Sequence, residues 1–445
     1  MSQLKREMGL RDVTLFAIAC IVGTRWIPAA AHAGPGSITL WLLAALLFVI
    51  PLAIAVASLI VKYPGVGGLY LWTRGDYGPW HGFLCFWVYW MGLAIWFPSA
   101  TMFYMSVGLS TLGIPTGRIT VLAVSLLGIW VALGTNLIGM KVGKWTQNLG
   151  GAASWIIGAL LAVVAALVWS RRGSATPMHL MPHWNWDTLS LWSTIAYAMS
   201  GLELAGLMGG EMRDPERTMP RAGWIASGFA VLFYASATVA LLVVLQPEKI
   251  SELNGYAEVA HTAGSILGST WLAPAIGVLV LASGVGQIGG IGTAISRLPF
   301  AAGVDGLLPK AFARVHPRWG TPHYSIIALG FVASFLLIAV QFGDTMRAAY
   351  QALVSLMVIV GFLPYLYIFG SSWKAGNRIS ALAGWSITIL AILCSVVPTA
   401  EITNVWLFEA KLAAGTLAAV ATAWLVYVHS NRSRARKEAL PHTRS

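Results

Sequence analysis

Long apolar runs dominate this sequence and restrict its fold more than any other feature. A helix needs about 20 apolar residues to cross a bilayer, and the chain of 445 residues has room for about twelve such runs. Only 10% of the residues are charged, whereas soluble domains average about 25%. We predict an all-α membrane protein with transmembrane helices near residues 12–33, 37–61, 80–110, 119–138, 148–169, 190–210, 222–245, 271–296, 323–341, 348–370, 380–398 and 406–429.

The distribution of lysine and arginine predicts the orientation in the membrane, because cytoplasmic loops are enriched in both. If the N-terminus is cytoplasmic, 21 of the 28 basic residues lie on the cytoplasmic side and 6 on the other, and Arg25 lies within the first span. We therefore predict that both termini are cytoplasmic and that the chain lies in the inner or plasma membrane of the cell. The polar segment 250–266 is predicted to be a surface helix on the outside.

The spans group into segments of different character. Residues 1–11 form a polar N-terminus with no cleavage site, so we expect no removed signal peptide. Residues 12–169 hold the first five predicted spans, 190–370 the next five, and 380–429 the last two. The tail 430–445 is basic and is expected to face anionic lipid headgroups. The net charge of +12 comes mainly from short loops and termini, so it does not indicate a nucleic-acid partner.

The sixth span, 190–210, carries polar residues where a lipid-facing helix has none. Ser200, Gly201 and Glu203 lie at its predicted mid-depth. An ionisable group at that depth costs about 2.5–3.5 kcal/mol on insertion scales, so it normally faces a cavity or a partner. We interpret this stretch as a broken helix that lines a binding site. The alternative is an unbroken helix with a small-residue packing face and a neutral, hydrogen-bonded glutamate.

The first span has a similar interruption at Gly23, Thr24 and Arg25, followed by Pro28. Spans 1 and 6 are five apart, so they enter the membrane from opposite sides. A pair of interrupted helices in two inverted halves is typical of the binding site of a secondary transporter. The breaks expose free N–H groups and free carbonyl groups. These groups match the carboxylate and the ammonium of an amino acid zwitterion.

Arg25 is the least expected residue in the apolar runs, because a guanidinium within a span should face a cavity or an anion. Three interpretations are open. Arg25 forms an ion pair with Glu203 between the two broken helices, it contacts the substrate directly, or it takes part in proton coupling through a neighbouring carboxylate.

Motifs for other chemistry are missing from the sequence. It contains no phosphate loop, dinucleotide fingerprint, metal cluster or nucleophile triad. Its three cysteines, Cys20, Cys85 and Cys394, lie in apolar runs without metal-ligand spacing. We therefore expect no enzyme activity, no cofactor, no metal and no ATP-driven pump.

Three motifs make the chain resemble the amino acid–polyamine–organocation (APC) permease superfamily over residues 8–430. The first is the span-1 motif Gly23-Thr24-Arg25, preceded by Asp12-Val13-Thr14. The second is Ser200-Gly201-Leu202-Glu203, followed by Glu211, Asp214-Pro215 and Pro220-Arg221-Ala222. The third follows span 8 and comprises Ser296-Arg297, Asp305-Gly306-Leu307-Leu308-Pro309, Phe312-Ala313-Arg314-Val315-His316-Pro317 and Thr321-Pro322.

The resemblance implies a five-plus-five inverted repeat with broken helices 1 and 6, two further C-terminal helices, and transport of amino acids or related amines by alternating access. It implies that the substrate carboxylate meets N–H groups around Thr24 and Arg25, and the neighbouring Gly23 is a further substrate-binding candidate. The ammonium would meet carbonyls around Ile21, Tyr197 and Ser200, with Tyr197 as an aromatic gate and Gly201 as a further substrate-binding candidate. Span 8 must run beside span 1 in this fold, so Gln287 and Ile291 are substrate-facing candidates, and Tyr89 in span 3 is another.

The sequence departs from the family pattern at two places. Arg25 stands where the family usually has a second glycine, and residues 150–154 lack the lysine that some relatives carry in span 5 in place of a sodium ion. We hypothesise that Arg25 supplies this fixed cation instead.

The sequence thus predicts a secondary active transporter of amino acids, either a proton-coupled symporter or an exchanger. The alternatives are a polyamine or organic-amine transporter, a passive channel and a membrane enzyme. The expected partners are a small amino acid or amine substrate, the lipid bilayer and, in a coupled mechanism, protons. Arg25, Glu203 and Tyr197 are the candidates for coupling and gating.

Overall fold

The computed structural model describes residues 9–63, 67–182, 185–207, 212–341, 345–398, 402 and 404–438. Within these residues, ten helices are long and apolar enough to cross a membrane, and the bent pair α1 and α2 makes an eleventh span. The all-α fold and the approximate number of spans are confirmed. The sixth predicted span corresponds to α9 and α10. Its last residues, 208–210, lie outside the described part, as do Glu211, residues 1–8 and residues 439–445 of the tail.

The helix order follows the predicted spans. The first half comprises α1 (Leu10–Ile21), α2 (Trp26–His32), α3 (Gly36–Ala44), a π-helical turn (Ala45–Val49), α4 (Ile50–Lys62), α5 (Leu69–Tyr77), α6 (Pro79–Thr111), α7 (Arg118–Leu137) and α8 (Met140–Arg172). The second half comprises α9 (Trp186–Ala198), α10 (Leu202–Gly206), α11 (Pro215–Val244), α12 (Gly255–Leu267), α13 (Leu272–Val304), α14 (His323–Val340) and α15 (Met346–Lys374). The helices α16 (Arg378–Ser395) and α17 (Val405–Glu438) complete the chain. Residues 430–438 of the predicted tail therefore continue α17.

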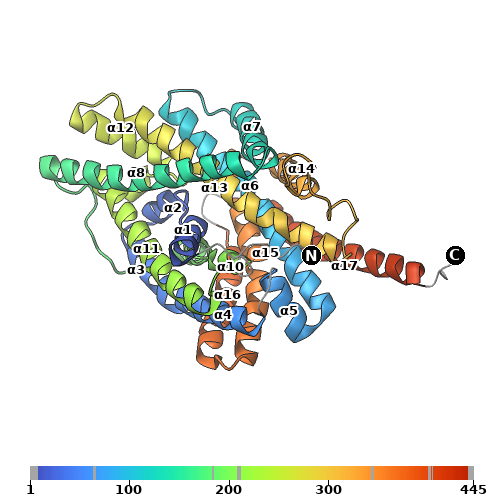
Figure 1. Cartoon of the computed structure of the whole chain (residues 1–445). Coiled ribbons are helices and arrows are strands. Elements are labelled where there is room, and N and C mark those ends of the chain that lie inside the picture. Colours follow the sequence, from blue (N-terminus) through green and yellow to red (C-terminus); the bar gives the residue numbers. More distant parts are fainter. Residues whose placement is uncertain are drawn as a thin grey trace.

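The short broken helices lie inside the bundle, and the uninterrupted helices surround them. The helix α1 packs against α11, α10 and α13, and α2 packs against α11 and α9 (Figure 1). In α6, 83% of the apolar 18-residue stretch that could cross the membrane is buried inside the protein, whereas in α17 only 17% of the corresponding stretch is buried. The helix α6 is therefore part of the core, and α17 lies at the edge of the bundle, where Figure 1 shows its end extending away from it.

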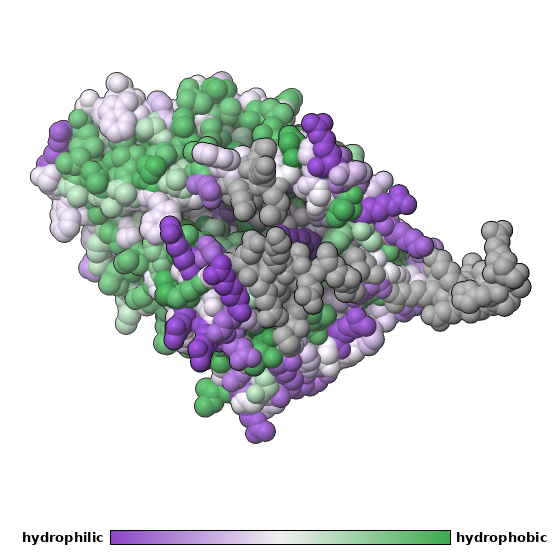
Figure 2. Space-filling model, viewed as in Figure 1, coloured by the Kyte–Doolittle hydropathy of each residue, from purple (hydrophilic) through white to green (hydrophobic). Residues whose placement is uncertain are grey.

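The surface matches a bilayer environment. Along α8, large apolar side chains such as Trp155, Val163 and Trp169 are exposed, and Figure 2 shows hydrophobic residues over much of that flank. Hydrophilic residues gather instead where Figure 1 shows α4, α5 and the start of α11. Exposed apolar surface of this extent is stable only against lipid or another apolar partner.

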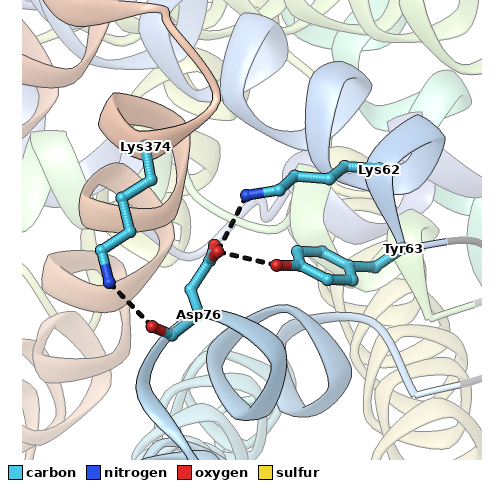
Figure 3. Close-up of polar contacts among 4 residues, drawn as sticks. All are labelled: Lys62, Tyr63, Asp76 and Lys374. Atoms are coloured by element: carbon cyan, nitrogen blue, oxygen red, sulfur yellow. Dashed lines mark hydrogen bonds and ion pairs between the residues drawn. The ribbon is translucent and has the colours of Figure 1, made fainter.

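Polar contacts hold the short helix α5 to its neighbours. The carboxylate of Asp76 accepts hydrogen bonds from Lys62 at 2.8 Å and from Tyr63 at 2.7 Å, while Lys374 donates to the Asp76 carbonyl at 2.7 Å (Figure 3). An acidic residue near a helix C-terminus is unfavourable without such cations, and the last carbonyls of a helix need donors. These contacts connect α5 to the ends of α4 and α15.

The prediction of a surface helix at 250–266 is only partly correct. The helix α12 covers Gly255–Leu267, but it packs against α13 and α6 along one face. Tyr256 on that face is fully buried, and its hydroxyl donates to the Thr24 carbonyl at 3.0 Å. One face of α12 is buried because it packs over the break in span 1.

Candidate substrate site at the two helix breaks

The first span breaks between Ile21 and Trp26, as predicted, and its two parts meet at a bend of 49°. Side chains from α11, α12 and α13 pair with the backbone groups that the break leaves unpaired, and the bond from Tyr256 of α12 to the Thr24 carbonyl is one of them. Tyr234 of α11 accepts from the Gly23 N–H and donates to the Ile21 carbonyl, both at 2.8 Å. Gln287 of α13 donates to the Val22 carbonyl at 3.0 Å. Because buried backbone groups must be paired, these contacts stabilise the break.

The second break lies between α9, which ends at Ala198, and α10, which begins at Leu202. Gly201 adopts φ +117°, a conformation that other residues rarely adopt. A Cβ atom at this position would also lie 2.7 Å from the Cys20 carbonyl oxygen of α1. Gly201 is therefore required both for the turn and for the close approach of the two broken spans.

A small pocket of about 30 Å³ lies between the two breaks. It brings together eight of the predicted site residues: Ile21, Tyr89, Tyr197, Ser200, Gly201, Glu203, Gln287 and Ile291. Gly23, Thr24 and Arg25 lie in the break of span 1 but do not line this central pocket. The remaining wall includes Trp26, Trp96 and Tyr365.

Two further cavities adjoin the central pocket on different sides. A wide cavity of about 530 Å³ shares Trp26 with it and continues past His32 and Tyr350. A narrow cavity of about 100 Å³ shares Cys20, Gln287 and Ile291 with it and continues between α1, α8 and α11. Single layers of side chains therefore separate the central pocket from both cavities.

Glu203 is the acidic group of the central pocket and is 1% exposed. Its Oε1 accepts from the Tyr89 hydroxyl at 2.7 Å, and its Oε2 accepts from the Gly201 N–H at 3.0 Å. The carboxylate thus caps the start of α10 and is held by neutral donors. A buried carboxyl group without a neighbouring cation can exchange a proton or accept a cationic ligand without first breaking an ion pair.

Arg25 has different partners from those predicted. Its Nη1 donates to the Ser99 hydroxyl at 2.7 Å, its Nη2 lies 3.2 Å from the Met357 sulfur, and its guanidinium lies 3.7 Å from the Trp26 ring centroid. The interpretation as an ion pair with Glu203 is therefore wrong for this structure. The side chain is fully buried, and its Nε has no hydrogen-bond partner in the described part of the chain.

A family model with the description amino acid permease matches residues 8–428. The chain belongs to the amino acid permease family. This places it in the APC superfamily, as the three sequence motifs predicted.

Relatives of the permease include transporters of different substrates. It is 24% identical to an uncharacterized transporter of Legionella pneumophila, over 96% of this chain and 97% of the relative. A serine/threonine exchanger of Bacillus subtilis is 28% identical over 75% of this chain and 76% of its own length. A probable agmatine/putrescine antiporter of Lactococcus lactis is 22% identical over 83% and 80%. The family and these relatives identify the permease as a multi-pass membrane transporter.

The hypothesis that Arg25 replaces a cation of span 5 gains no support from its contacts. Its recorded hydrogen bonds are to α6 and α15, and none of them reaches a described side chain of α8. Ser154 of α8 instead pairs with Ser283 of α13 at 2.7 Å. Gly150 and Gly286 bring these two helices into close backbone contact, which leaves little space for a long side chain between them.

The backbone groups predicted to hold the substrate differ in their availability. The Ile21 carbonyl already accepts from the Tyr234 hydroxyl, and the Tyr197 carbonyl accepts from the N–H groups of Ser200 and Met199. Among the described residues, none donates a hydrogen bond to the Ser200 carbonyl, and the N–H groups of Thr24 and Arg25 have no acceptor. Within this part of the chain, the Ser200 carbonyl at the second break and the N–H groups of Thr24 and Arg25 at the first are therefore free to bind a ligand.

Several residues that shape the site were not predicted from the sequence. Tyr234, Tyr256 and Tyr104 surround the break of span 1, and Tyr104 donates to Gln287 at 2.6 Å. Trp26 separates the central pocket from the wide cavity. A tyrosine in an apolar run, as at Tyr234, is a signal that could have been used, because a buried hydroxyl normally finds a partner. Its partner is 211 residues away and could not have been identified in this way.

Proposed function

We propose that the permease is a secondary active transporter of zwitterionic amino acids that works by alternating access. The observation that carries the proposal is the central pocket, which lies between both helix breaks and between two cavities. The proposal includes an inverted repeat formed by residues 12–169 and 190–370, supported by breaks in spans 1 and 6. It also includes a location in the cell membrane with cytoplasmic termini, supported by the distribution of basic residues.

The charges around the breaks favour a zwitterion. The free N–H groups of Thr24 and Arg25, which lie in the break of span 1 outside the lining of the central pocket, would meet the substrate carboxylate once the break moves towards the pocket, and the guanidinium of Arg25 contributes positive charge on the same side. The free carbonyl of Ser200 and the carboxylate of Glu203 fit the ammonium. A diamine would bring a second positive charge towards Arg25, and like charges repel strongly in a site of low dielectric constant.

Two aromatic side chains are proposed to gate the side of the wide cavity. The rings of Trp26 and Tyr197 meet edge to face with centroids 6.2 Å apart, and both line the central pocket. Tyr197 also packs against Phe362 at 5.2 Å and fits over Gly361, where a Cβ atom would lie 2.7 Å from its hydroxyl. Rotation of Trp26 or Tyr197 would connect the pocket with the wide cavity without unfolding a helix.

Glu203 is proposed to couple transport to protons or to respond to the charge of an exchanged substrate. The donors Tyr89 and Gly201 fit the ionised carboxylate, which only accepts hydrogen bonds. Binding of a proton would disturb at least one of these contacts, and Gly201 is the residue that joins the two broken spans. A change in the charge of Glu203 would thus reach the contact between α1 and α10.

The second candidate function is polyamine transport, because one relative is named as a probable agmatine/putrescine antiporter. In that case Glu203 would bind one ammonium group, and Arg25 would oppose the second. The two functions therefore predict opposite effects of removing the charge of Arg25.

Uptake by purified permease in proteoliposomes tests both functions. We expect saturable uptake of at least one labelled amino acid, no competition by putrescine, and stimulation either by a proton gradient or by internal unlabelled substrate. Arg25→Met should lower this uptake at least tenfold, whereas Arg25→Lys, which keeps the charge, should lower it less. Competition by putrescine that becomes stronger in Arg25→Met would favour polyamine transport. Flux that does not saturate would contradict both functions and indicate a channel.

A further inference from the structure

A cavity of about 930 Å³ lies between α6, α17 and the segment that follows α13. It is separate from the central pocket and shares no lining residue with it. One hydrogen bond near it connects α17 to the α13 side, from Ser430 to the Gly306 carbonyl at 3.0 Å. Another connects α6 to α17, from Trp87 to Thr422 at 3.0 Å. Pockets of a few hundred to about 1,000 Å³ typically hold small organic ligands. We call it the α17 cavity.

The walls of the α17 cavity are apolar and reach the lipid-facing edge of the bundle. Trp90, Leu307 and Leu308 form a buried part. On the α17 side, Trp424 is 56% exposed and Leu425 is 57% exposed. Since α17 is the least buried of the candidate membrane spans, this side of the cavity faces the bilayer. Hydrocarbon chains can therefore enter it from the membrane.

Two cations complete the lining, Lys310 and Arg432. Both are exposed, and neither forms an ion pair with a described residue. Asp305, the acidic residue nearest to Lys310 in the sequence, instead pairs with Arg74 at 3.3 Å and accepts from the Tyr70 hydroxyl at 2.9 Å. The cavity therefore combines unpaired positive charge with an apolar interior, and it lies on the side that the basic loops predict to be cytoplasmic.

The indole N–H of Trp90 is a further sign of a ligand. Trp90 lines the cavity and is only 5% exposed, yet its Nε1 has no hydrogen-bond partner among the described residues. A buried donor without an acceptor costs about 1–3 kcal/mol, and the N–H of a buried tryptophan usually finds a partner. An oxygen-rich ligand in the α17 cavity would provide one.

We propose that the α17 cavity binds one anionic phospholipid of the cytoplasmic leaflet. The phosphate contacts Lys310 and Arg432, an ester or phosphate oxygen accepts from Trp90, and the acyl chains lie along Leu307, Leu308 and Leu425. Basic pockets between transmembrane helices on the cytoplasmic side are known to bind anionic headgroups. This site is independent of the proposed transport function, because it shares no residue with the central pocket.

Native mass spectrometry of the purified permease tests the site. The probes are phosphatidylglycerol, phosphatidylcholine with the same acyl chains, and glycerol phosphate, which has no acyl chain. We expect retention of one phosphatidylglycerol and release of phosphatidylcholine at the same collision energy. Each of Lys310→Ala and Arg432→Ala should weaken retention roughly fivefold. Trp90→Phe, which keeps the ring and removes the N–H, should weaken it by a smaller factor.

The matched control is Arg118→Ala with Lys249→Ala, which removes two cations predicted to lie on the opposite side of the membrane. Equal retention of the two phospholipids would overturn the proposal, and so would an equal loss in the control variant. Full competition by glycerol phosphate would show a phosphate site rather than a lipid site. A dimer that forms by displacing the lipid would assign the α17 surface to a second copy of the chain. If Lys310→Ala or Arg432→Ala prevents folding, the comparison of the two phospholipids on the unsubstituted permease and on Trp90→Phe still tests the proposal.

Discussion

Tyr234 and Ile21 are joined by a hydrogen bond of 2.8 Å, and the same hydroxyl accepts from the Gly23 N–H on the other side of the break. The hydroxyl also lies 3.3 Å from the Ala198 carbonyl at the end of α9. One side chain of α11 thus contacts the ends of both interrupted spans. Because a hydroxyl has a single proton, it can donate to only one of the two carbonyls at a time, so its donor bond can switch between them as the breaks move.

Tyr234→Phe tests this connection, because it removes the hydroxyl and keeps the ring stacked on Trp41 at 4.3 Å. We expect a clearly lower thermal stability, since each buried backbone group left unpaired costs about 1–3 kcal/mol. Uptake should fall as well. The matched control is Tyr324→Phe, at a tyrosine that is 41% exposed and whose hydroxyl bonds to none of the described residues. Equal melting temperatures for the two variants would contradict the role of Tyr234.

Tyr197→Ala should weaken substrate retention, because it removes a ring that lines the central pocket beside Trp26. We expect the apparent KM for the transported amino acid to rise roughly tenfold, which corresponds to about 1.4 kcal/mol and is near the upper end for an aromatic contact. Tyr197→Phe should stay close to the unsubstituted permease, because it keeps the ring. Uptake kinetics in proteoliposomes check this prediction. An unchanged KM in Tyr197→Ala, with the melting temperature confirming a folded protein, would remove Tyr197 from the gate.

Glu203→Gln should flatten the dependence of uptake on external pH, because glutamine keeps the shape of the side chain but cannot bind or release a proton. In a proton-coupled symporter, uptake by the unsubstituted permease should rise as the external pH falls. Uptake measured over a series of external pH values gives the slope. Glu216→Gln, at an exposed residue of α11, is the control and should keep the original slope. A Glu203→Gln variant with that same slope would exclude Glu203 as the coupling group.

Asp76→Asn should destabilise the contact between α5, α4 and α15. Burial alone would raise the pKa of Asp76, but the hydrogen bonds from Lys62 and Tyr63 outweigh it and hold the pKa below its usual value. A lowered pKa means that the stabilisation is present above the unfolded value of about 3.9 and is lost as the pH falls through the folded value. We expect a loss of the order of 1 kcal/mol at pH 7, because Lys62 is partly exposed.

Thermal melting of Asp76→Asn and of the unsubstituted permease between pH 7 and pH 3 measures this effect. The difference between the two melting temperatures should shrink as the pH falls below about 4. Asp214→Asn is the control, because Asp214 is half exposed and asparagine caps a helix as well as aspartate does. A difference that stays constant across the pH range would show that the charge of Asp76 does not contribute.

Much of the fold was predictable because its determinants are local. Apolar runs of membrane length predicted the helices, and the short polar interruptions predicted the breaks after Ile21 and Ala198. Gly201 is the clearest case, since the positive φ of the turn and the contact with Cys20 both require a residue without a side chain. The placement of Gln287 and Ile291 beside span 1 came from the family resemblance. Their contact with substrate, like that of the other predicted site residues, stays a prediction.

Hydropathy and backbone propensity act over a few neighbouring residues, so the amino-acid order alone was enough to locate the membrane spans and the ends of their helices. Which groups meet at those ends depends on how distant helices pack together. Arg25 contacts Ser99 and Met357 instead of Glu203, and Tyr234 pairs with backbone groups more than 200 residues away. Such pairings depend on how the helices pack around the breaks, and packing places a buried charge against whichever donors, acceptors and rings surround it.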